Sequence, residues 1–272
     1  MINNIKNILK VIIPQKLIRF ISNKFQYNSF KGNFKNFDEI NYYTTNYDSN
    51  KIIKKVHNAF EISNRNTNLI DRDGEILKTK NQNFEMLTEI INFLDKSKKN
   101  CVIDYGGSLA NFIRNNINYL GKYNLVWIVI DNKKICLLGK KIIKNNNIYF
   151  FEDLDNANKF ILAKDLKVKF CLFGSSIQYI RNFEKILKNL SFLKVQNIIV
   201  ERQPVLKSKD TKYAIQKVPF WVGGYSYAVK LYNSQKLVNL FMKYNFFLNK
   251  KINSFGNQFK DGEYKSYIFK KR

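Results

Sequence analysis

Polar and acidic residues in this chain stand directly after short apolar runs, first in the stretch Asn100–Asn111, NCVIDYGGSLAN. The apolar run Cys101–Ile103 leads into Asp104, and the pair Gly106–Gly107 follows before a helical pattern begins. A strand, a glycine turn and a helix in this order let the backbone approach a nucleotide closely, with a carboxylate at the strand end. Ala110 stands roughly where the dinucleotide fingerprint has its third glycine, so a βα turn without a ligand is the competing interpretation.

Four later apolar runs are each followed at once by acidic or small polar residues. In chain order they are Leu125–Ile130 before Asp131, Ile148–Phe151 before Glu152 and Asp153, Lys169–Phe173 before Ser175 and Ser176, and Asn197–Val200 before Glu201 and Arg202. Helical patterns lie between these runs, and this alternation predicts a parallel sheet with helices on both faces. Because ligands bind outside the carboxyl ends of such strands, we predict a nucleotide-type ligand at that edge.

The C-terminal segment departs from this alternation. A helix predicted over 234–244 precedes the apolar residues Phe246–Leu248, and Tyr264–Phe269 closes the chain without another helix between them. Two strands joined in this way predict an antiparallel hairpin at the sheet edge. This arrangement resembles that of S-adenosylmethionine-dependent methyltransferases. We therefore predict an α/β, Rossmann-like methyltransferase fold, a mostly parallel seven-stranded sheet with a C-terminal antiparallel hairpin, preceded by a helical N-terminal extension.

The N-terminal part of the chain predicts helices rather than a separate core. Segment 1–25 has apolar residues at helical spacing, is basic and contains no acid. Two further helices are predicted over 49–60, with Ser49 as a cap, and over 84–94. The polar segment Ile62–Lys80 is interpreted as a loop or lid. We therefore divide the chain into a helical N-terminal extension or lid, 1–97, and an S-adenosylmethionine-binding methyltransferase domain, 98–272.

Composition limits the class of partner. The chain has 272 residues, 45% of them hydrophobic, and a formal net charge of +26, which suits a globular protein with a polyanionic partner. Lysines occur in every segment rather than in one tract, so biased composition is the competing explanation, and nucleic acid is the less favoured partner. Segment 1–25 is a candidate for peripheral association with an anionic membrane, although docking on the protein's own core is favoured.

Cysteine and histidine usage exclude several kinds of site. Cys101, Cys136 and Cys171 are isolated, which argues against a disulfide framework and a structural zinc site. His57 is the single histidine, so we predict no metal centre. No apolar run approaches the ~18 residues that a membrane span needs. We expect a cytoplasmic protein, with association at the inner face of the membrane as a further expectation.

Several motifs of this chain occur in the same order as in a known protein family. The runs are VIDYGGSLAN, VWIVID, FFEDL, SSIQYI, IIVERQPV and YAIQKVP, and FKGNFKNFDEI and NYDSNKII precede them. Together they resemble a bacterial family of predicted methyltransferases associated with lipopolysaccharide and other surface-glycan gene clusters. The resemblance covers about residues 30–269. Asp131 stands where the family commonly has glutamate, and Ala110 where many methyltransferases have a further glycine.

The resemblance implies S-adenosylmethionine as cofactor and assigns roles to the residues at the strand ends. The residues expected near its methionine part are Asp104, Tyr105, Gly106 and Gly107. Asp131 is expected to bind the ribose hydroxyls, and Glu152 or Asp153 to lie by the adenine. The residues expected to face the sulfonium and the acceptor are Ser175, Ser176, Gln178 and Tyr179. The competing interpretation of Asp153 and of the two serines is helix capping.

Methyl transfer to a sugar hydroxyl also needs a general base. The candidates are His57, Tyr179 and Glu201, with Arg202 and Gln216 orienting the acceptor. His57 has the only side chain whose unperturbed pKa lies near neutrality, but a lone histidine on a helix is more often a surface residue. The sequence leaves the base open.

These sequence features are compatible with three alternative functions. The leading one is an S-adenosylmethionine-dependent methyltransferase that O-methylates a saccharide or nucleotide-sugar of the cell surface. The second is an RNA methyltransferase, motivated by the charge. The third is a non-catalytic, membrane-associated scaffold that keeps the methyltransferase fold. Asp131→Ala separates them, because it should abolish activity only in the first two.

Overall fold

The computed structural model describes residues 29–41, 43–44, 49–66, 68–72, 74–78, 84–218 and 225–272. The predicted basic helix 1–25 lies outside these residues. No helix in the described ranges is both long enough and apolar enough to cross a membrane.

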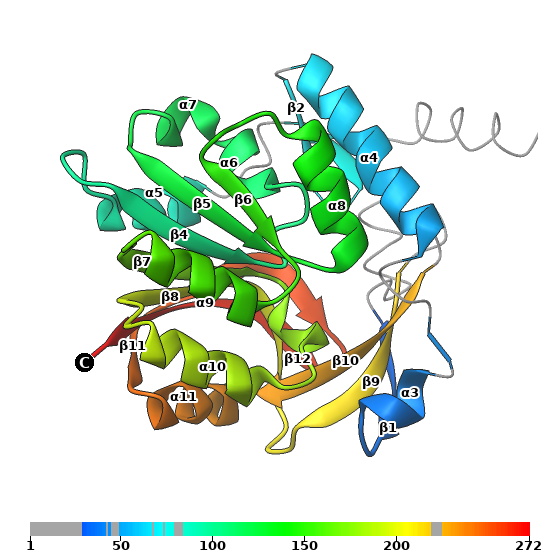
Figure 1. Cartoon of the computed structure of the whole chain (residues 1–272). Helices are drawn as coiled ribbons and strands as arrows, with labels where there is room; N and C mark the ends of the chain where they lie inside the picture. Colours follow the sequence, from blue (N-terminus) through cyan, green and yellow to red (C-terminus); the bar gives the residue numbers. More distant parts are fainter. Residues whose placement is uncertain are drawn as a thin grey trace, which may run out of the picture.

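Five parallel strands form the centre of the molecule, in the order β6-β5-β4-β7-β8 (Figure 1). Their bounds are β4 Asn100–Tyr105, β5 Leu125–Ile130, β6 Ile148–Phe151, β7 Val168–Gly174 and β8 Asn197–Leu206. Each contains one of the predicted apolar runs. Every residue of β5 is buried, because helices cover both faces of a parallel sheet.

The C-terminal hairpin consists of β11 (Phe246–Phe259) and β12 (Gly262–Lys271). β12 pairs antiparallel with β8 on one side and with β11 on the other. The seven strands therefore have the order β6-β5-β4-β7-β8-β12-β11, with β12 reversed. This confirms the predicted Rossmann-like methyltransferase fold, a mostly parallel sheet with an antiparallel C-terminal hairpin.

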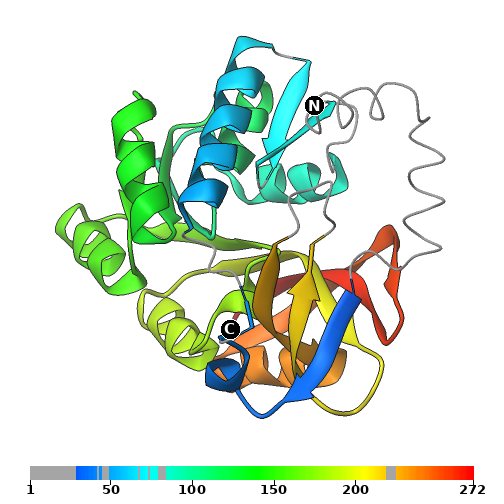
Figure 2. The ribbon, with the colours of Figure 1, turned by 90° about the vertical axis from the view of Figure 1, so that its right-hand side faces the viewer.

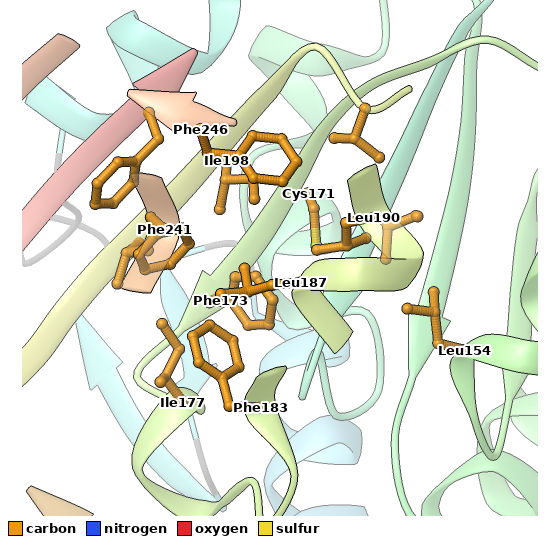
Figure 3. Packing of buried hydrophobic residues seen from close by; sticks show 14 of the residues in the cluster. Leu154, Cys171, Phe173, Ile177, Phe183, Leu187, Leu190, Ile198, Phe241 and Phe246 are labelled. Atoms are coloured by element: carbon orange, nitrogen blue, oxygen red, sulfur yellow. The ribbon is translucent and has the colours of Figure 1, made fainter. Parts of the chain in front are cut away.

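Two buried clusters hold helices on opposite faces of the sheet. The helices of the first face are α9 (Leu154–Ala163), α10 (Phe183–Phe192) and α11 (Ser234–Lys243), and those of the second are α5 (Phe84–Phe93), α6 (Asn111–Asn115) and α7 (Ile117–Leu120). α8 (Lys133–Ile142) follows β5. Figure 3 shows the first cluster, in which the ring of Phe183 lies 5.5 Å from that of Phe241 and 5.4 Å from that of Phe173. This packing fixes the strand ends that carry the polar residues.

Three strands extend the sheet in a way that the sequence did not predict. They are β1 (Ser29–Phe34), β9 (Lys212–Lys217) and β10 (Ser226–Asn233). β10 pairs with the end of β8, β9 with β10, and β1 with β9, so the sheet has ten strands (Figure 2). The N-terminal region is therefore joined to the main sheet by a strand.

The N-terminal region also contains helices and a hairpin. These elements are α3 (Phe37–Asn41), α4 (Asn50–Arg65), β2 (Leu69–Arg72) and β3 (Glu75–Lys78). The β2–β3 hairpin lies inside the segment predicted as a loop or lid. Ser49 occupies the cap position of α4, but its side chain makes no capping hydrogen bond. A domain boundary at residue 97 stays a prediction.

Candidate functional site

A cavity of about 120 Å³ lies at the carboxyl ends of β4 and β7 and beside Glu201 and Arg202 in the middle of β8. Six predicted site residues line it, namely Asp104, Gly106, Gly107, Ser175, Glu201 and Arg202. The remaining lining residues are Ile70–Arg72 of β2, Ser108, the α6 residues Asn111, Phe112 and Asn115, Asn116 after α6, and Leu172 and Gly174 of β7. The sheet therefore brings the glycine turn together with residues almost 100 positions later in the chain.

Asp104 is a buried acid of this cavity, with 2% of its surface exposed. The indole nitrogen of the fully buried Trp127 donates a hydrogen bond of 3.0 Å to its Oδ2. Burial raises the pKa of Asp104 from 3.8 to about 7; the bond from Trp127 opposes that rise, and the charges of Asp131 and Glu201 add to it. Asp104 thus gains or loses a proton near neutral pH, and a cationic ligand would favour its ionised form.

The glycine turn packs tightly against protein atoms. Gly106 has a φ of +78°, and a Cβ there would lie 2.7 Å from the Cβ of Ser176. Ser176 is itself held by the 2.7 Å bond that its Oγ donates to the Tyr105 carbonyl. A Cβ on Gly107 would lie 2.5 Å from the Asp104 carboxylate. The turn therefore excludes side chains because they would collide with the protein.

Gly106→Ala is expected to lower the free energy of unfolding by about 1–3 kcal/mol, because it combines a strained positive φ with a collision against Ser176. Urea unfolding of the two proteins measures the loss. Gly174→Ala is the matched control, since a Cβ on Gly174 meets nothing within 4 Å. Equal stability of Gly106→Ala and the wild type would contradict the tight packing of the turn.

Asp131 ties the turn after β4 to the start of α8. Its Oδ2 accepts a 2.9 Å bond from the Ser108 backbone nitrogen, and its Oδ1 accepts bonds of 2.7 and 3.0 Å from the backbone and side chain of Asn132. Asn132 in turn caps α8 through the Ile135 nitrogen. A carboxylate offers about four acceptor positions, so a ribose would share these oxygens. Ribose binding by Asp131 stays a prediction.

The acids after β6 are exposed and do not line the cavity. Asp153 caps α9, accepting a 2.7 Å bond from the Asn156 nitrogen. Asp155 pairs with Lys185 at 2.9 Å, and that bond lowers its pKa. The capping interpretation of Asp153 is thus confirmed, and an adenine contact by Glu152 or Asp153 stays a prediction.

The segment after β7 is held by hydrogen bonds to its neighbours. Ser175 has a φ of +57°, and its Oγ lies 3.2 Å from the Arg202 carbonyl. The Gln178 side-chain nitrogen donates a 2.6 Å bond to the Ser175 carbonyl. Tyr179 is 39% exposed and donates a 2.7 Å bond to Gln216 of β9. Tyr179, in the segment after β7, and Gln216, on β9, therefore meet, but outside the cavity.

His57 belongs to α4 and does not line this cavity. Its Nε2 is 3.8 Å from Glu61, and its side chain is 41% exposed. Of the three candidate bases, His57, Tyr179 and Glu201, only Glu201 lines the cavity.

A buried ion pair fixes the β2 wall, and sequence reasoning missed it. Asp71 is 1% exposed, and its Oδ1 lies 3.3 Å from the guanidinium of Arg114 on α6. Ser63 of α4 donates a 2.8 Å bond to the same oxygen. The Arg114 guanidinium also lies 4.2 Å from the centre of the Phe60 ring. No local pattern links residues 71 and 114, so only an isolated acid in an otherwise apolar LID triplet could have hinted at burial.

Three buried polar atoms near this edge lack hydrogen-bond partners among the described residues, namely Ser108 Oγ, Gln178 Oε1 and Arg202 Nε. Such atoms are rare and indicate a ligand or water. The cavity is smaller than the ~300–1,000 Å³ of a site for a whole drug-sized ligand. It is therefore large enough for only part of such a ligand, and the described cavity lining does not reach Asp131. No group of three His, Cys, Asp or Glu in the described ranges could hold a metal ion.

Comparison with known proteins gave matches among solved structures. Models of protein families and curated proteins gave none. An S-adenosylmethionine-dependent methyltransferase from Methanosarcina mazei covers 67% of this chain and 96% of its own, with 12% identity and a TM-score of 0.48. One from Mesorhizobium loti covers 71% and 100%, with 8% identity and a TM-score of 0.48. The match to LepI in complex with SAM covers 69% of this chain and 46% of the LepI chain, with 11% identity and a TM-score of 0.45. Because these TM-scores lie below 0.5, we base the function on topology and site geometry.

Proposed function

We propose that this protein is an S-adenosylmethionine-dependent methyltransferase that O-methylates a small-molecule acceptor, a saccharide or nucleotide-sugar of surface-glycan biosynthesis. The observation that carries the proposal is the cavity in which Asp104 and the glycine turn after β4 meet Glu201 of β8. It lies on a sheet whose strand β12 is reversed between β8 and β11. The glycan acceptor is supported only by the order of the sequence motifs.

The chain's residues divide into a cofactor group and an acceptor group. Asp104 would face the ammonium of the methionine end, Gly106 and Gly107 keep the turn compact, and Asp131 would bind the ribose. Glu201 lines the same cavity and is the candidate general base, which would take the proton of the acceptor hydroxyl. When bound, S-adenosylmethionine would supply the methyl carbon to the acceptor oxygen, and the electron pair of the broken C–S bond would remain on sulfur. The residues of the cavity thus mainly position the reactants.

Calorimetric titration with S-adenosylhomocysteine is the test of this function. We expect micromolar binding by the wild type and a loss of about tenfold or more in Asp131→Ala, which removes charge-assisted hydrogen bonds. Glu201→Gln should keep the affinity but lower the release of S-adenosylhomocysteine with nucleotide-sugar acceptors by about 100-fold or more.

Asp155→Asn is the control, because Asp155 is exposed and pairs with Lys185 outside the cavity. Thermal unfolding of each variant verifies that it is folded, since Asp131 also tethers the turn. A folded wild type that does not bind S-adenosylhomocysteine would contradict the enzyme assignment and favour a non-catalytic role.

A further inference from the structure

We propose that Arg72 and Arg202 form an oxyanion subsite in this cavity and that the acceptor carries a phosphate or carboxylate group which they bind. This inference rests on the proposed function and narrows its substrate class. Arg72 comes from the β2–β3 hairpin and Arg202 from the middle of β8, so two cations from distant parts of the chain line one cavity.

The β8 backbone is irregular at Arg202. Val200 pairs with Tyr267 and Gln203 with Lys265, so Glu201 and Arg202 together oppose the single residue Ser266 of β12. This is a β-bulge, a feature that re-aims side chains and is frequent next to active sites. Arg202 has a φ of +51°, and its backbone nitrogen donates a 3.0 Å bond to Ser266 Oγ. Non-glycine residues seldom adopt this conformation, and active sites are among the places where such residues cluster.

The two guanidinium groups are available to a ligand. Neither Arg72 nor Arg202 belongs to an ion pair with a carboxylate among the described residues. The Nε of Arg202 is buried without a hydrogen-bond partner there, and its guanidinium lies 5.9 Å from the centre of the Tyr264 ring. Both side chains are half-buried. A planar guanidinium in such a place is suited to bidentate binding of phosphate or carboxylate.

The charges in the cavity favour the acceptor as the source of the oxyanion. Three carboxylates belong to the described lining: Asp71, which pairs with Arg114, and Asp104 and Glu201. The methionine end of the cofactor brings an ammonium, a sulfonium and one carboxylate, and thus a net positive charge that Asp104 and Glu201 suit. The cofactor's single carboxylate would engage at most one arginine bidentately. The other arginine is left for an anionic acceptor.

The test uses the full chain, titrated calorimetrically with inorganic phosphate and, separately, acetate at about 0.15 M salt to screen surface lysines. Each titration is done alone and with saturating S-adenosylhomocysteine. We expect an anion to bind in both states and its affinity to fall about tenfold or more in Arg72→Gln and in Arg202→Gln. Arg72→Lys should recover only part of the loss. Preference for phosphate indicates a phosphorylated acceptor, and preference for acetate a carboxylated one.

Arg65→Gln is the matched control, because Arg65 is 79% exposed and pairs with Glu61 on α4. Unchanged affinity of Arg72→Gln for phosphate and acetate would overturn the subsite. If Arg202→Gln does not fold, the result for Arg72→Gln decides. Competition between phosphate and S-adenosylhomocysteine would also overturn the subsite, since the arginines would then serve the cofactor carboxylate. Anion binding that depends on both arginines, without any S-adenosylhomocysteine binding, would support the subsite and contradict only the proposed function.

Discussion

Asp104→Asn is expected to stabilise the protein at alkaline pH and to weaken cofactor binding. Asparagine keeps an oxygen to accept the 3.0 Å bond from Trp127 and removes a buried negative charge. In the wild type, the pKa of Asp104 rises from 3.8 to about 7 on folding, chiefly through burial. The native state therefore holds a proton between about pH 4 and pH 7 that the unfolded chain has released. Stability is lost as the pH rises through this window, by up to about 4 kcal/mol above it.

Urea unfolding of both proteins at pH 5 and pH 8 measures this effect. We expect the free energy of unfolding of Asp104→Asn, relative to that of the wild type, to be higher at pH 8 than at pH 5 by about 3 kcal/mol. Asp155→Asn, which changes an exposed acid, should not reproduce this difference. The same pH dependence in Asp104→Asn and the wild type would contradict ionisation of Asp104 near neutrality.

The same substitution reports on the site. If the Asp104 carboxylate faces the cofactor ammonium, wild-type affinity for S-adenosylhomocysteine should rise as the pH passes about 7 and Asp104 ionises. Asp104→Asn should bind about tenfold or more weakly at pH 8 and lose that rise. If Asp104→Asn is more stable than the wild type but binds S-adenosylhomocysteine more weakly, the Asp104 carboxylate acts on the ligand. Replacing a purely structural residue would not raise stability and lower affinity together.

Arg114→Ala is expected to lower the free energy of unfolding by about 3–5 kcal/mol, because it leaves the carboxylate of Asp71 buried without its partner. It also removes the contact of the guanidinium with the Phe60 ring. Since Asp71 belongs to β2, the wall of the cavity should loosen with it. Urea unfolding measures the loss of stability, and proteolysis between residues 66 and 84 reports on the hairpin.

Arg65→Ala is the control for Arg114→Ala. The Arg65–Glu61 pair is exposed, and such pairs contribute about 0–1 kcal/mol. The double variant Asp71→Ala/Arg114→Ala should lose less than the sum of the single variants, because no charge remains buried and unpaired. A loss below about 1 kcal/mol in Arg114→Ala would show that the pair does not hold the hairpin.

Local patterns determined the central sheet and the position of its polar edge. The strands of this sheet are buried on both faces, so each appears as an apolar run such as Leu125–Ile130 that needs no knowledge of its partners. Local patterns also predicted that Asp104, Gly106 and Glu201 lie close together. A parallel sheet gathers the residues that follow its apolar runs at one edge. The C-terminal hairpin also followed from the chain, because two strands without a helix between them are joined locally.

Only the tertiary structure decided which polar residues meet. β1 pairs with β9 across more than 170 positions, and Asp71 pairs with Arg114 across 43, and short windows of sequence contain no sign of either contact. The bulge that re-aims Arg202 depends on its partner strand β12, so the residues Glu201 and Arg202 look like an ordinary strand end until β12 is in place. Burial raises the pKa of Asp104 for the same reason, because the low-dielectric surroundings of a carboxyl group are built by residues from the whole fold.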